Sequence, residues 1–259
     1  MNNSVSIIVP TYKEAPNLPG LIESIHSVMG STGRTYEVVI VDDDSRDGSE
    51  KIIADLSAGG YPVRMILRTN ERGLSSAVVR GFLEARWDIL ICMDADLSHP
   101  PEALPRMIRE IETPGVDFVV GSRYIPGAGT DEQWGFFRWL NSKVATLLAR
   151  PLTKIKDPMS GFFALTRSTF DRRDALNPIG YKIGLELLVK CRCKNVREIP
   201  IHFSNRRFGK SKLNLQEQMN YLKHLKRLAD YKFFRPSSLE TRPGNPYEKA
   251  EYEKKHLLR

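Results

Sequence analysis

Short runs of apolar residues alternate with longer segments of helical period along the first half of the chain. The short runs, rich in Val and Ile, predict strands at residues 5–9, 37–41, 63–67, 89–93 and 118–120. Apolar residues spaced three and four apart predict helices at residues 18–29, 49–56, 74–85 and 103–111. Because the strand runs are apolar on both faces, this alternation predicts an α/β fold with a mostly parallel central sheet and helices on both faces.

The second half of the chain is less regular. Its pattern predicts helices at residues 134–150 and 183–193, a strand at 162–166 and a mobile loop at 126–131. A final stripe, beside several basic residues, predicts an amphipathic helix over 215–234; its apolar members are Leu215, Met219, Leu222, Leu225 and Ala229. We therefore divide the chain into a domain of residues 1–213, a basic amphipathic helix at 214–235 and a charged, proline-containing tail at 236–259, which we expect to be disordered.

Composition narrows the classes of function. The 259 residues carry a net charge of +8, with the excess concentrated between residues 206 and 235. Such a face suits phosphorylated molecules, anionic membranes or nucleic acid, but the basic segment has no known nucleic-acid motif. The chain has neither a G-x-G-x-x-G nor a P-loop motif, which argues against a dinucleotide oxidoreductase and a P-loop NTPase.

Three cysteines without a C-x-x-C pair favour a reducing compartment. There is no apolar run of about eighteen residues to span a membrane, and the start of the chain lacks the features of a signal peptide. We therefore expect a cytosolic protein that is soluble or peripheral to a membrane.

Candidate catalytic side chains follow the predicted strands. Asp94 and Asp96 flank Ala95 directly after the run at 89–93. Side chains two positions apart at a strand end project to the same side, so both carboxylates can face one cation. Hard oxygen ligands of this kind suit Mg²⁺ or Mn²⁺, although an isolated D-x-D pair also fits a solvated turn.

Other charged residues are predicted near the same edge of the sheet. The acidic cluster at 42–47 follows the strand at 37–41 and suits either hydrogen bonds to a nucleoside or the capping of a helix. The basic candidates are Arg123, Arg138, Arg206 and Lys212. Arginine forks match phosphate oxygens, yet each residue alone is typical of a solvated surface.

Seven short motifs, taken in their order along the chain, resemble those of a known family. They are PTYKE at 10–14, VDDDSRDG at 41–48, RGLSSA at 72–77, DADLSHPP at 94–101, GSRY at 121–124, DPMSGFF at 157–163 and RxxGxSK at 206–212. Over residues 4–234 the chain resembles family-2 glycosyltransferases, and within them the dolichol-phosphate mannose synthases. The resemblance implies a GT-A Rossmann-like catalytic domain in the first 213 residues.

The resemblance also implies an activity. Similar enzymes transfer mannose from GDP-mannose to dolichyl or another polyprenyl phosphate, with inversion at the anomeric carbon and with Mg²⁺ or Mn²⁺. One alternative is the same activity with another donor, such as UDP-glucose, or with an undecaprenyl acceptor. Another is a non-catalytic scaffold subunit, but the presence of both Asp94 and Asp96 argues against a scaffold.

The family likeness assigns roles to individual positions. It implies a nucleotide pocket formed by Pro10, Tyr12, Glu14, Val41 and Asp43. Cation and diphosphate would be held by Asp94, Ala95 and Asp96, with Ser98 as a third metal ligand where many relatives carry Gln. Phosphates would be neutralised by Arg123, Arg206 and Lys212, and Arg138 would lie in the acceptor segment; Asp94, Asp96, Arg123 and Arg138 are the catalytic candidates.

The implied lipid acceptor predicts a position on the cytoplasmic face of the plasma membrane or the endoplasmic reticulum. The helix at 215–234 would dock on the membrane surface, or a membrane protein would recruit the chain. The same apolar stripe also fits a helix packed on the catalytic core.

Overall fold

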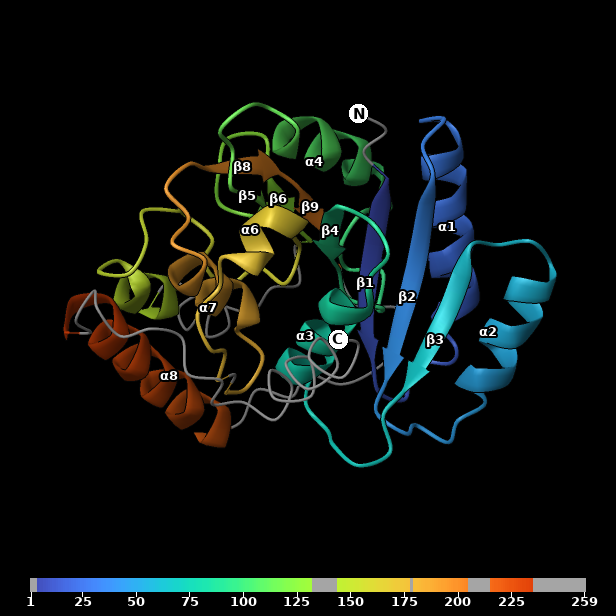
Figure 1. Cartoon of the computed structure of the whole chain (residues 1–259), viewed down its shortest axis with the longest axis horizontal. Coiled ribbons are helices and arrows are strands. Elements are labelled where there is room, and N and C mark those ends of the chain that lie inside the picture. Colours follow the sequence, from blue (N-terminus) through green and yellow to red (C-terminus); the bar gives the residue numbers. More distant parts are fainter. Residues whose placement is uncertain (1–3, 132–143, 178, 205–214, 235–259) are drawn as a thin grey trace, which may run out of the picture.

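The chain is built around a seven-stranded sheet with strand order β3-β2-β1-β4-β7-β5-β8 (Figure 1). The structure, a computed structural model, describes residues 4–131, 144–177, 179–204 and 215–234. The strands are β1 Val5–Thr11, β2 Tyr36–Asp42, β3 Val63–Leu67, β4 Ile89–Cys92, β5 Phe118–Ser122, β7 Phe163–Thr166 and β8 Val196–Pro200. A small second sheet pairs β6, Gly129–Thr130, with β9, His202–Phe203.

Helices surround the sheet. They are α1 Leu18–Gly30, α2 Ser49–Ala58, α3 Leu74–Glu84, η1 Pro101–Ala103, α4 Leu104–Ile111, α6 Arg167–Asp171, α7 Ile183–Lys190 and α8 Leu215–Phe234, and residues 144–149 are also helical. Among the strands of the described ranges, only β7 runs antiparallel to its neighbours, β4 and β5, and the other pairings in this sheet are parallel. The carboxyl ends of β1, β2, β4 and β5 therefore meet at one edge, where ligands bind in sheets of this kind.

Alternate residues of the central strands enter two separate cores. Ile7 and Val9 of β1 pack in a core that also contains side chains of α1, α2 and α4. Ile8 packs on the opposite face with side chains of α3, α6 and α7. Figure 1 shows the consequence, a sheet enclosed between helices, which confirms the predicted α/β class and the mostly parallel sheet.

The α8 helix packs on α7 and the helix at 144–149. Leu225 and Leu228 are buried in a third cluster with Ala149, and the Tyr221 hydroxyl donates to the Ala145 carbonyl at 2.6 Å. Of the predicted stripe, Leu225 and Ala229 face this core, whereas Met219 and Leu222 are about half exposed. The helix thus presents apolar side chains in two directions.

Some elements differ from the sequence prediction. The segment at 126–131, predicted as a loop, contains β6, and the patterns did not predict α6, β8 or β9. The helix predicted over 183–193 ends at Lys190, because Arg192 has a φ of 54°, which a right-handed helix cannot accommodate. The helix predicted at 134–150 is described only from residue 144, and the tail from 236 lies outside the described residues. No helix in the described ranges has the length and apolar character needed to cross a bilayer.

Candidate functional site

A hollow of about 750 Å³ lies at the carboxyl ends of β1 and β2. Its lining includes Tyr12, Lys13, Asp44, Arg46 and Arg72. The Tyr12 ring has the guanidinium of Arg72 at 5.1 Å and the ammonium of Lys13 at 5.5 Å from its centroid. An aromatic ring with two cations beside it can stack on a base and attract phosphate in the same space.

The acidic loop after β2 is held rigidly by its own side chains. Asp42 accepts hydrogen bonds from Thr11 Oγ1 at 2.9 Å and from the backbone N–H of Ser45 at 2.8 Å. Asp47 accepts from the backbone N–H of Ala15 at 3.1 Å, which ties this loop to the one after β1. Asp44 instead pairs with Arg46 at the rim of the hollow, and the hydrogen bond from Arg46 lowers the pKa of Asp44.

The residues predicted to bind the nucleotide fall into two groups. Tyr12 lines the hollow, whereas the Val41 side chain is wholly buried in the core. Asp43 accepts from Arg68 Nε and from the backbone N–H of Gly73, both at 2.7 Å, so its carboxylate fixes the loop that carries Arg72. Nucleotide contact by Val41 and Asp43 remains a prediction, as it does for Pro10 and Glu14.

Pro10 lies buried within β1, and the Glu14 carboxylate accepts a hydrogen bond from Asn17 Nδ2 at 2.6 Å. Lys13 and Arg72, which the family likeness did not single out, contribute more directly to the hollow. Their signal in the sequence was their position in the PTYKE and RGLSSA motifs.

Asp94 and Asp96 follow β4 and differ in their surroundings. The Asp94 side chain is 29% exposed, and among the described residues its carboxylate accepts no hydrogen bond. Asp96 is buried, and its Oδ1 accepts from the backbone N–H of Ser98 at 3.1 Å and from Ser98 Oγ at 2.5 Å. Ala95 between them is buried. One carboxylate is thus open to a ligand and the other is fixed in place.

His99 lies beneath this pair. Its Nδ1 accepts the backbone N–H of Asp94 at 3.0 Å, so this nitrogen carries no proton, and burial lowers the pKa of His99. The ring stacks on Phe162 at a centroid distance of 5.1 Å. A Cβ on Gly161 would lie 3.3 Å from Asp94 Oδ1 and 3.4 Å from His99 Cε1, so the glycine leaves room for both groups. The DADLSHPP and DPMSGFF motifs therefore meet here.

The Ser98 hydroxyl donates to Asp96 and the residue is wholly buried. In this arrangement Ser98 orients a carboxylate, and its predicted role as a metal ligand remains a prediction. Within the described ranges there is no group of three or more His, Cys, Asp or Glu side chains able to hold a metal. Two aspartates can nevertheless bind a hard cation whose other ligands are water and diphosphate oxygens.

Arg123, after β5, forms a two-pronged ion pair with Asp157. Its Nε and Nη2 donate to the Asp157 carboxylate at 2.7 and 2.8 Å. The sequence patterns did not identify Asp157 as the partner, because the two residues are 34 positions apart. The other predicted basic residues, Arg138, Arg206 and Lys212, lie outside the described residues.

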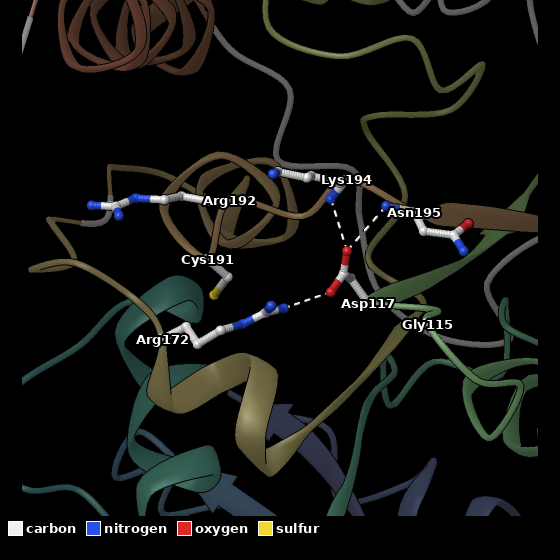
Figure 2. A pocket seen from close by; sticks show the side chains of 7 residues that line it. All are labelled: Gly115, Asp117, Arg172, Cys191, Arg192, Lys194 and Asn195. Carbon is white, nitrogen blue, oxygen red and sulfur yellow. Dashed lines mark hydrogen bonds and ion pairs between the residues drawn. The ribbon is translucent and has the colours of Figure 1, made fainter. Parts of the chain in front are cut away.

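A second hollow, of about 590 Å³, lies at the amino ends of β5 and β8 (Figure 2). Asp117 in its wall accepts from Arg172 Nη2 at 2.6 Å and from the backbone N–H groups of Lys194 and Asn195. Burial opposes ionisation of Asp117, but these hydrogen bonds dominate and lower its pKa. Its carboxylate is already satisfied, and the hollow is at the opposite edge from the aspartate pair. We therefore assign the candidate site to the carboxyl ends of β1, β2, β4 and β5.

Comparison with known proteins places the chain in a family. The profile of the family described as "Glycosyl transferase family 2" matches residues 6–173. The chain belongs to glycosyl transferase family 2. The matched segment of this family-2 chain includes β1, β2 and β4, together with the Tyr12 hollow and the aspartate pair.

Several relatives resemble this family-2 chain over most of its length. A dolichol-phosphate mannosyltransferase of Mycosarcoma maydis is 45% identical, over 89% of this chain and 80% of that protein. One of Saccharomyces cerevisiae is 42% identical over 90% of each chain. One of Pyrococcus furiosus is 46% identical over 88% of this chain but only 64% of its own length.

Solved structures confirm the GT-A fold. Glucosyl-3-phosphoglycerate synthase of Mycobacterium tuberculosis superimposes with a TM-score of 0.64 at 18% identity, over 91% of this chain and 82% of that one. Mannosyl-3-phosphoglycerate synthase of Rubrobacter xylanophilus gives a TM-score of 0.65 at 20% identity, over 95% and 79%. At such identity the likeness concerns the fold alone.

Proposed function

We propose that this family-2 chain transfers mannose from GDP-mannose to dolichyl or a related polyprenyl phosphate with inversion of configuration at the anomeric carbon. One observation carries the proposal: the partly exposed Asp94 and the buried Asp96 lie at the same edge of the sheet as the cationic hollow around Tyr12. The mannosyltransferase relatives, at 42–46% identity over about nine-tenths of the chain, support the choice of sugar and acceptor.

The chemistry needs positioning more than a strong base. A phosphate monoester is already anionic near neutral pH, so its oxygen can attack the anomeric carbon once it is oriented. The bond from that carbon to the diphosphate breaks on the opposite face, and negative charge builds on the departing diphosphate. Lys13, Arg72 and Arg123 supply positive charge near this edge. Arg123 is held in place by Asp157, and a cation fixed in advance stabilises the negative charge that develops in the transition state.

Asp94 and Asp96 would hold a divalent cation. The donor set fits, because two carboxylates at one strand end offer the hard oxygens that Mg²⁺ and Mn²⁺ prefer. Structural neighbours of the same fold have been crystallised with Mn²⁺ and UDP, which supports such a site. When bound, the cation would offset the charge of the leaving diphosphate.

A radiolabelled transfer assay tests this function. With a short polyprenyl phosphate and Mn²⁺, we expect organic-extractable product from GDP-mannose and at least about 10-fold less from UDP-glucose. A site whose polar groups hydrogen-bond one nucleotide sugar leaves them unpaired with another, and so discriminates against it. Chelation by EDTA is expected to abolish transfer, and added Mn²⁺ to restore it. A higher rate with UDP-glucose would refute the proposed donor, and full activity in EDTA would refute the metal.

We further propose that the chain works at a membrane surface through α8 and the helix at 144–149. Side chains that are about half exposed or more lie on these two neighbouring helices: Val144, Leu147, Leu148, Met219 and Leu222. The exposed Lys223, Lys226 and Arg227 of α8 lie close to these apolar residues in the chain and suit anionic headgroups.

Replacement of both Leu147 and Leu222 by Gln tests this docking. Since burying each leucine is worth about 1.5–3 kcal/mol, we expect at least about 10-fold less co-sedimentation with anionic vesicles. The control is Leu67→Gln, an exposed leucine at the end of β3 that is expected to leave binding unchanged. Equal losses from both variants would contradict the docking face.

A further inference from the structure

The ion pair between Arg123 and Asp157 lies beside the aspartate pair and is largely enclosed. Asp157 is wholly buried, and only 11% of the Arg123 side chain is exposed. Asp157 Oδ2 accepts from the backbone N–H of Arg123 at 3.0 Å and from its Nε at 2.7 Å, while Oδ1 accepts from Nη2 at 2.8 Å. Three hydrogen bonds to one carboxylate fix both the plane and the position of the guanidinium.

The scaffold fixes Asp157 independently of Arg123. Glu198 of β8 accepts the backbone N–H of Lys156 at 2.9 Å and that of Asp157 at 3.1 Å. On the other side, Ser160 Oγ donates to the Gly121 carbonyl of β5 at 2.7 Å, and the Ser160 N–H donates to the Asp157 carbonyl at 3.3 Å. The segment from 156 to 160 is thus tied to two adjacent strands, so the carboxylate is a rigid anchor.

Aromatic contacts link this pair to the candidate metal site. The Arg123 guanidinium lies 5.3 Å from the centroid of the Phe203 ring. Phe203 packs edge-on against His99 at 5.4 Å, and His99 accepts the backbone N–H of Asp94. A continuous set of contacts therefore sets the position of the guanidinium relative to Asp94.

We propose that Asp157 is a positioning residue for the transfer reaction. It holds the Arg123 guanidinium beside Asp94, where the exposed part of that side chain meets phosphate oxygens of the departing diphosphate. The inference rests on the proposed function, in which Arg123 neutralises phosphate. A guanidinium fixed before the substrate arrives loses no further conformational freedom when charge develops, and this preorganisation favours the transition state over the ground state.

Desolvation makes a purely structural role a poor explanation of the pair. Taking a carboxylate and a guanidinium out of water costs more than packing apolar side chains of similar volume in the same place. The pair lies at the edge of the proposed phosphate site, and Glu198 holds the backbone of Asp157 in place. Its burial is explained better if Asp157 serves to orient the partly exposed Arg123.

The test uses Asp157→Asn in the full chain, which keeps the shape of the side chain but cannot accept from both Nε and Nη2 as a carboxylate does. We expect kcat to fall by about 10- to 100-fold, as for loss of a preorganised charge contact, while the donor KM changes by less than about 3-fold. The control is Glu112→Gln, which breaks the similar two-pronged pair of Arg34 and Glu112, with bonds of 2.6 and 2.9 Å, far from the site. It is expected to leave kcat unchanged.

A double-mutant cycle separates positioning from folding. If Asp157 acts through Arg123, Asp157→Asn adds less than about 2-fold to the loss caused by Arg123→Ala. The proposal would be overturned if Asp157→Asn lowered kcat as much in the Arg123→Ala background as in the wild-type chain. It would also be overturned if Asp157→Asn lowered the melting temperature but left the kcat of the folded protein unchanged.

Binding of GDP with Mn²⁺, measured by calorimetry, gives a readout that does not need turnover. GDP carries the charge of the departed leaving group, so Arg123→Ala and Asp157→Asn are expected to weaken its binding by the same factor, at least about 3-fold. Unchanged GDP affinity in Asp157→Asn refutes the positioning role. Absence of transfer by the wild-type chain, with GDP binding still sensitive to Asp157, refutes only the proposed function.

Discussion

Replacement of Asp96 by alanine is expected to lower the proposed transfer rate by about 10²- to 10³-fold, because a preorganised charge contact to a leaving group is worth about 3–4 kcal/mol. Asp96 is buried and accepts two hydrogen bonds from Ser98, so its carboxylate is held in a defined position that alanine cannot reproduce. Initial rates at saturating donor, acceptor and Mn²⁺ would measure the loss, with circular dichroism to confirm the fold.

Asp88→Ala is the matched control for Asp96→Ala. Asp88 is an exposed acid just before β4, so it lies at the opposite end of the strand that Asp96 follows. The control is expected to retain the wild-type rate within about 2-fold, as surface substitutions usually do. Turnover of Asp96→Ala above a tenth of the wild-type rate would remove the assigned metal role, even if the chain still transfers mannose.

The apolar runs of the sequence predicted the sheet because its parallel strands are buried on both faces. β8 was missed for the opposite reason: it is an edge strand in which Arg197 is exposed and Glu198 is half-buried, so it has no apolar run. Nor did the apolar pattern indicate that the strand at 162–166 is inserted antiparallel between β4 and β5. Strand partners depend on contacts between distant residues, which periodicity does not record.

The candidate site was predictable where a single strand end carries the chemistry. Asp94 and Asp96 follow one apolar run, and the structure places both beside His99. The hydrogen bonds of Asp43 to Arg68 and Gly73 were not visible in the sequence, and its predicted contact with a nucleotide stays a prediction. The pairing of Arg123 with Asp157 was not visible either. Sequence motifs indicated the strand ends at which Tyr12, Asp94, Asp96 and Arg123 lie, whereas the hydrogen-bond partners of these residues required the three-dimensional structure.

Gly81→Leu is expected to cause the second large loss, this time of stability. Gly81 of α3 lies directly on the sheet: a Cβ there would be 2.5 Å from Ile8 Cγ2 and 3.0 Å from Val41 Cγ2. Both neighbours are wholly buried, so the added side chain forces α3 away from β1 and β2. We expect the free energy of unfolding to fall by about 3 kcal/mol or more, the upper end of the usual cost of overpacking.

Gly30→Leu isolates the packing effect from helix propensity. Gly30 is the last residue of α1, and a Cβ there would have no atom within 4 Å, so the same substitution meets open space. Leucine is a better helix former than glycine by somewhat less than about 1 kcal/mol, so Gly30→Leu should be neutral or slightly stabilising. Urea denaturation of both variants measures the difference, and the loss in Gly81→Leu should lower the melting temperature by about 6–12 °C. If Gly81→Leu unfolds at the wild-type urea concentration, α3 does not pack on β1 and β2 as closely as the structure shows, and the position of the loop that carries Arg72 is in question.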